Sequence, residues 1–125
     1  MIYTSYFGRI DAMIDNDILP VAITTKKPDW YNGFCYKKLA PSTSSLLDFR
    51  VDHQWEKFAE RYREERLRKC DAKTVLADIE TLIGVSLEDT DIALMSYEYE
   101  DPNHRCLVRE WLVANGIPCE EWESY

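Results

Sequence analysis

The sequence predicts an α/β protein in which a mostly parallel sheet is flanked by helices, giving three layers. Three short apolar runs rich in β-formers indicate the strands, at residues 1–6, 19–25 and 92–97. Enough chain separates the runs for the right-handed crossovers that join parallel strands. A length of 125 residues with 46% hydrophobic content favours one domain over residues 1–125.

The first half of the chain carries two of these strands and an irregular segment. The first strand ends near Gly8, which permits a turn, and residues 10–16 have the spacing of a short helix. Pro20 must lie at the start of the second strand, because proline cannot donate to a central ladder. Residues 29–52 indicate a long ordered loop or short helical turns, either functional or a lid pinned by its aromatic residues over one sheet edge.

Two amphipathic helices are expected before the third strand. Residues 53–70 place aromatic side chains on one face and alternate acidic with basic residues on the other, which is typical of a solvated surface. Asp71 is a good N-cap for the next helix, and Gly84 supplies its C-terminal stop.

The third strand leads into the last helix, expected at about residues 103–115. Asp101 or Asn103 can cap its free N–H groups, with Pro102 in the first turn. Its apolar stripe directs Trp111 and Leu112 inward. Residues 117–122 then add a short edge strand, protected by proline and glutamates.

Parallel neighbours would gather polar residues at one rim, where the strands end. That rim comprises Ser5, Tyr6, Arg9, Thr24, Thr25, Lys26, Ser96, Glu98, His104 and Arg105. Its cations and the helix N-terminus favour a phosphate or carboxylate group. Glu98 and His104 are the candidate catalytic residues, and Glu98 also suits ribose hydroxyls. The structural alternative pairs Glu98 with Arg105 and lets His104 satisfy a backbone carbonyl.

Several kinds of site are disfavoured. The chain has only two histidines, and His53 lies in a different element from His104, so we expect no metal site and no other cofactor. The four cysteines lack Cys-x-x-Cys spacing. A serine nucleophile would lack its Gly-x-Ser-x-Gly context, and no Gly-rich phosphate loop is present.

Net charge and hydropathy limit the partners. The formal charge of −8 makes nucleic acid an unfavourable partner, because its affinity comes mainly from cations on phosphate. No apolar run is long enough to span a membrane, and the start lacks a signal-peptide pattern. We therefore expect a cytoplasmic protein.

The stretch around the third strand also resembles a known family, the domain-of-unknown-function 488 family. The family carries a Cys-Tyr-Glu or similar triplet after an apolar strand and a Cys-His-Arg triplet opening a helix. Their counterparts are Ser96-Tyr97-Glu98 and Asn103-His104-Arg105. The resemblance extends to residues 36–42 and to Phe58 with Arg61-Tyr62. It implies an α/β fold and candidate residues but no reaction, and both motif cysteines are replaced here.

Two classes of function follow from these observations. The first is a small enzyme or sensor whose rim binds an anion, a phosphate ester or a nucleotide-like molecule, through Ser96, Glu98, His104 and Arg105 with Arg9 and Lys26. The second is a non-enzymatic interaction or inhibitor protein whose acidic surface binds a cationic protein partner. The ligand-binding rim is the reading we favour.

Overall fold

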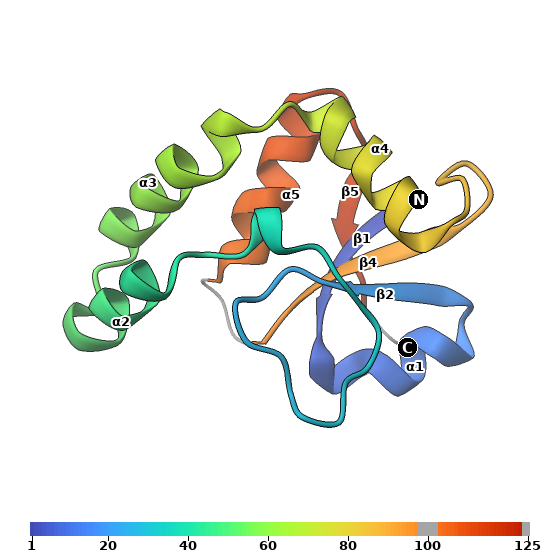
Figure 1. Cartoon of the computed structure of the whole chain (residues 1–125), viewed down its shortest axis with the longest axis horizontal. Coiled ribbons are helices and arrows are strands. Elements are labelled where there is room, and N and C mark those ends of the chain that lie inside the picture. Colours follow the sequence, from blue (N-terminus) through green and yellow to red (C-terminus); the bar gives the residue numbers. More distant parts are fainter. Residues whose placement is uncertain (98–102, 124–125) are drawn as a thin grey trace.

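A five-stranded parallel sheet forms the centre of the computed structural model, which describes residues 1–97 and 103–123 (Figure 1). In chain order the strands are β1 Ile2–Tyr6, β2 Ile18–Ala22, β3 Phe34–Cys35, β4 Asp91–Ser96 and β5 Cys119–Glu121. Their order across the sheet is β3-β2-β4-β1-β5, and every recorded pairing is parallel. The predicted fold class is therefore confirmed, with the three predicted strands adjacent at the centre and β5 at one edge.

Pro20 lies in the middle of β2, which corrects the prediction that it must stand at the strand's start. The N–H of Ile23 donates to the Met95 carbonyl of β4 at 2.9 Å. Alternate residues of a strand direct their N–H groups to the same side, so the Pro20 nitrogen faces β3 instead. Because β3 pairs only with Val21 and Ala22, no ladder partner is lost at the proline.

The segment between β2 and α3 is more regular than its sequence suggests. Within residues 29–52 the chain forms β3, a 3₁₀ turn at Lys37–Leu39 and the ten-residue helix α2, Thr43–Asp52. The prediction of a loop or short turns was wrong for α2. This helix has no apolar stripe, because it exposes aliphatic side chains, and its start depends on the Ser42 side chain, which accepts the N–H of Ser45 at 3.2 Å.

Four further helices surround the sheet: α1 Ile10–Asp15, α3 Trp55–Glu65, α4 Ala72–Ile83 and α5 His104–Ala114. The single helix predicted over residues 53–70 is shorter. His53 takes the left-handed conformation that ends α2, with φ of 53°, so α3 begins only at Trp55. A separate 3₁₀ turn follows at Leu67–Lys69.

The predicted helix caps are present at α4 and α5. Asp71 accepts the N–H three residues further on at 3.0 Å, and Gly84 ends α4 with φ of 77°. Asn103 caps α5 in the same way at 3.3 Å. The alternative cap at Asp101 and the first-turn role of Pro102 lie outside the described residues. Throughout the described ranges, none of the helices is both long and apolar enough to cross a membrane.

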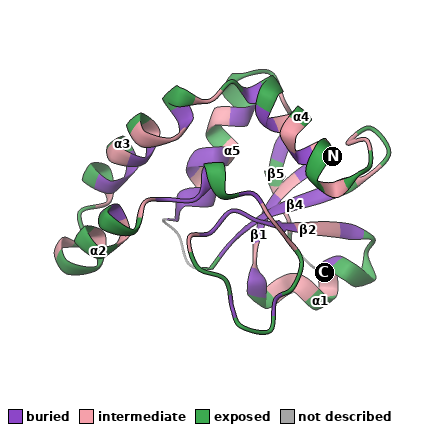
Figure 2. Cartoon of the chain, viewed as in Figure 1, coloured by how far each residue is buried: buried purple, intermediate pink, exposed green. Residues whose placement is uncertain are grey.

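The core lies on both faces of the sheet (Figure 2). On one face Met13 of α1 packs with Met95 of β4. On the other, Tyr62 of α3, Ile79 of α4 and Leu112 of α5 form a larger cluster. The sheet is therefore the middle layer of three, and α2 is attached from outside through α3.

The buried stripe of α5 gives the first prediction. Leu112 is fully buried as predicted, whereas Trp111 is only partly buried at the edge of the core. Leu112→Ala should lower the free energy of unfolding by about 2–5 kcal/mol, because it leaves a cavity. Val113→Ala is the matched control, since Val113 is 55% exposed, and it should change stability by less than about 0.5 kcal/mol. Urea melts giving equal losses for the two variants would contradict this placement of α5.

Candidate functional site

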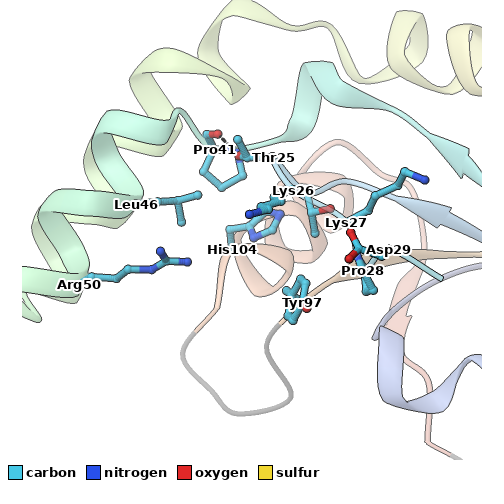
Figure 3. Close-up of a pocket in the computed structure, with 11 residues that line it drawn as sticks. Thr25, Lys26, Lys27, Pro28, Asp29, Pro41, Leu46, Arg50, Tyr97 and His104 are labelled. Atoms are coloured by element: carbon cyan, nitrogen blue, oxygen red, sulfur yellow. Dashed lines mark hydrogen bonds between the residues drawn. The ribbon is translucent and has the colours of Figure 1, made fainter. Parts of the chain in front are cut away.

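A pocket of about 520 Å³ opens beside the carboxyl ends of β2 and β4 (Figure 3). Its lining residues are Thr24, Thr25, Lys26, Lys27, Pro28, Asp29, Pro41, Leu46, Arg50, Tyr97 and His104. They come from the loop after β2, from α2 and the residue before its cap, from the end of β4 and from the start of α5. Open parallel sheets bind ligands at this end of their strands, so this pocket is the candidate site.

His104 closes one wall of the pocket. It is the first residue of α5 and only 5% exposed. Its Nε2 lies 2.7 Å from the carbonyl oxygen of Ile23, and because a carbonyl only accepts, Nε2 carries the proton and donates. This is the carbonyl contact that the structural alternative predicted. Any acid–base role for His104 would therefore fall to Nδ1.

Tyr62 supports His104 from behind. The two rings meet edge to face, with centroids 5.6 Å apart. The Tyr62 hydroxyl donates to the Leu39 carbonyl at 2.5 Å, and burial raises the pKa of Tyr62, so this donor stays protonated at neutral pH. Tyr62 thus connects α3 both to α5 and to the segment that precedes α2.

The pocket wall is mainly cationic. Lys26, Lys27 and Arg50 border it, and Asp29 is the one acidic side chain among the described lining residues. Lys27 donates to the carbonyl oxygen of Tyr31. Within the part of the chain that the structure describes, Lys26 and Arg50 have no ion-pair or hydrogen-bond partner, so these two charges are available to a ligand.

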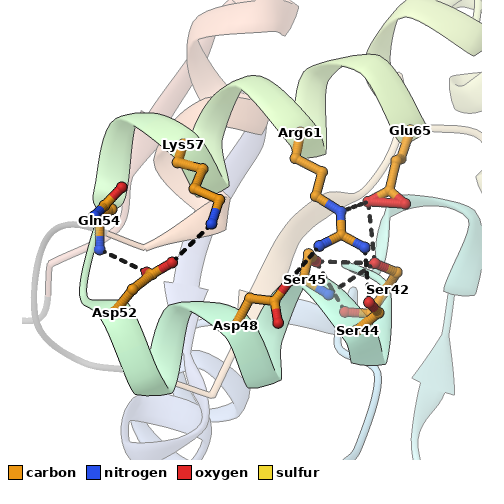
Figure 4. Close-up of polar contacts among 9 residues, drawn as sticks. All are labelled: Ser42, Ser44, Ser45, Asp48, Asp52, Gln54, Lys57, Arg61 and Glu65. Atoms are coloured by element: carbon orange, nitrogen blue, oxygen red, sulfur yellow. Dashed lines mark hydrogen bonds and ion pairs between the residues drawn. The ribbon is translucent and has the colours of Figure 1, made fainter.

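Contacts between α2 and α3 fix the outer wall (Figure 4). Arg61 of α3 binds the Asp48 carboxylate and the Ser44 hydroxyl, each at 2.8 Å. It also lies 3.2 Å from Glu65, which accepts a hydrogen bond from Ser42 at 3.1 Å. These contacts hold α2 in place, and with it the two α2 side chains that line the pocket.

Other residues of the predicted rim meet at Glu121 in β5, away from this pocket. Arg105, which is 2% exposed, places its Nε 3.1 Å from Glu121 and donates through Nη1 to the Ser96 hydroxyl at 2.6 Å. Arg9 approaches the same carboxylate at 3.4 Å, and Thr4 donates to it at 2.7 Å. The structure therefore divides the rim into a pocket and a buried ion-pair network.

The six predicted ligand-binding residues thus separate into groups. His104 and Lys26 line the pocket, three others belong to the network, and Glu98 lies outside the described residues. Sequence reasoning does not find Arg50 or Tyr97. The serine-rich cap of α2 is the signal that would have revealed a helix, and so a face for Arg50, in this segment.

Potential metal ligands and cysteines are distributed over the described ranges. There, His, Cys, Asp and Glu side chains form no group of three or more suited to a metal ion. The four cysteines form no disulfide with one another. Burial raises the pKa of Cys119 to about 11, which keeps it a thiol at neutral pH.

The fold and the pocket define an α/β protein with a parallel sheet and a ligand-sized cavity at its carboxyl edge. A family model described as the active DUF488-N3 subclade matches residues 14–116, so the chain belongs to the domain-of-unknown-function 488 family, as its motifs indicated. No significant match was found among curated proteins or solved structures.

The ion-pair network gives a stability prediction. Glu121→Ala removes the carboxylate that neutralises buried Arg105, and we expect it to lower the free energy of unfolding by about 3 kcal/mol. Glu120→Ala removes the same charge from an exposed neighbouring side chain and should cost less than about 0.5 kcal/mol. Denaturant melts in which the two variants match would show that Arg105 does not depend on Glu121.

Proposed function

We propose that this protein binds a small anionic ligand, a phosphate ester or a nucleotide, in the pocket at the carboxyl ends of its strands. The observation that carries the proposal is a cationic pocket in an acidic chain. Among the residues that the structure describes, three basic side chains and one carboxylate line it, whereas the whole chain has a formal charge of −8. Charges around a cleft act across low-dielectric walls, so this local excess attracts anions despite the net charge.

The size and position of the pocket support the same proposal. Its volume of about 520 Å³ lies within the range of roughly 300–1,000 Å³ that is usual for small-molecule sites. The N-terminus of the eleven-residue helix α5 meets the pocket at His104. Backbone N–H groups and the partial positive charge of such a terminus favour a negatively charged group.

Catalysis at this site would use the candidates already named. Glu98 and His104 are residue types that serve as general base and acid. The matched subclade is described as active, which favours a working site over a purely architectural one. Arg105 and Arg9 would then act indirectly, by fixing β5 and the start of α5.

A second candidate function is a non-enzymatic interaction or inhibitor protein with a cationic protein partner. Leu47 and Val51 favour it, since they lie one helical turn apart on α2 and are 53% and 83% exposed. Exposed aliphatic side chains on an acidic molecule suit a partner that combines apolar and basic residues. This alternative needs no ligand in the pocket.

Titration calorimetry with inorganic phosphate, sugar phosphates and nucleotides tests the proposal. Arg50→Ala and Lys26→Ala should each weaken binding about tenfold or more, because each removes a charged hydrogen-bond donor, and neither should lower the melting temperature. Binding should also weaken as salt is added. Lys73→Ala is the matched control, since it removes one exposed positive charge from α4, outside the pocket.

If no phosphorylated compound binds the wild-type protein at millimolar concentration, the ligand-site proposal fails. The interaction-protein alternative would then be the better account of the acidic surface.

A further inference from the structure

One residue of the pocket wall, Tyr97, belongs to a cluster of aromatic rings. Phe7, which follows β1 and is 4% exposed, lies at the centre of a cluster of four rings. Its ring centroid is 5.2 Å from Tyr31, 5.7 Å from Tyr97 and 6.1 Å from Trp30, all in edge-to-face geometry. Burial raises the pKa of Tyr31 to about 12, and its hydroxyl donates to the Phe34 carbonyl at 2.6 Å. This hydrogen bond attaches the cluster to β3.

Tyr97 combines this fixed position with an open surface. It lines the pocket directly after β4, yet it is 54% exposed. The edge contact with Phe7 holds the ring without covering it. A large aromatic side chain that is both fixed and half exposed provides a surface on which another flat ring can stack.

The rest of the lining matches a ligand with two chemically different ends. Pro28, Pro41 and Leu46 add apolar surface to the wall. Figure 3 shows Arg50 reaching from α2 toward the side where Tyr97 and His104 lie. One cavity therefore contains cationic groups for a phosphate and apolar surfaces for a flat ring.

We infer that the ligand is a nucleotide whose base stacks on Tyr97 while its phosphate binds Lys26 and Arg50. This inference rests on the proposed function, because it specifies the ligand class of the same pocket. A sugar phosphate would use the cations but would leave the aromatic surface uncovered. Stacking of a base on an aromatic side chain contributes roughly 1–3 kcal/mol, or about 5- to 150-fold in affinity.

Calorimetry with adenosine 5′-monophosphate and ribose 5-phosphate separates the two contributions, because the second probe keeps the ribose and phosphate but has a hydroxyl in place of the base. Wild-type protein should bind the nucleotide at least about fivefold more tightly. Tyr97→Leu should abolish this preference and leave the affinity for ribose 5-phosphate unchanged, whereas Tyr97→Phe should retain it. Arg50→Ala should weaken both probes by a similar factor.

Trp30→Leu is the matched control. Trp30 is 58% exposed and contacts Phe7 but does not line the pocket, so this variant should keep the nucleotide preference. Equal wild-type affinity for the two probes, or a preference that survives Tyr97→Leu, overturns the inference while the phosphate site stands. If neither probe binds, the proposed function itself fails, and the inference fails with it.

Discussion

The hydrogen bond from His104 to the Ile23 carbonyl is the contact on which the pocket depends. It joins the first residue of α5 to the chain just beyond β2, two places 81 residues apart in sequence. The Tyr62 ring contacts the imidazole edge to face, and its hydroxyl donates a hydrogen bond to the Leu39 carbonyl. A polar ring so buried must have its donor satisfied. This contact therefore fixes the start of α5 against the loop after β2, and both of these segments line the pocket.

Arg105 and Arg50 lie near opposite ends of their helices, so their charges are stabilised in different ways. An arginine near a helix N-terminus is unfavourable there unless a carboxylate compensates, and Glu121 supplies that carboxylate to Arg105. Arg50 lies near the C-terminal end of α2, where a positive charge is favourable without any partner. Arg105 thus forms a structural ion pair, whereas Arg50 lines the pocket.

The sequence could predict the elements that depend on local signals, and it could not predict those that depend on contacts between distant residues. Strands β2 and β4 were predictable because buried parallel strands need apolar runs, and β1 because it is rich in β-forming residues. Helix α4 was predictable because Asp71 and Gly84 mark its ends locally. Helix α2 was missed because its sequence has no apolar residues at helical spacing. Its polar contacts with α3, such as those of Arg61 with Asp48 and Ser44, depend on the tertiary fold. The convergence on Glu121 was not predictable either, since it requires the register of β5 beside β1.

Ser96 and Asn103, which stand where the family resemblance would place cysteine, are oxygen acceptors with structural roles. Ser96 accepts from the guanidinium of Arg105 at 2.6 Å, and Asn103 caps α5. Both tasks suit oxygen better than sulfur, because short charge-assisted bonds and N-caps favour hydroxyl and amide oxygens. Neither side chain lines the pocket. The proposed ligand site, with Lys26, Arg50 and Tyr97, therefore uses neither position.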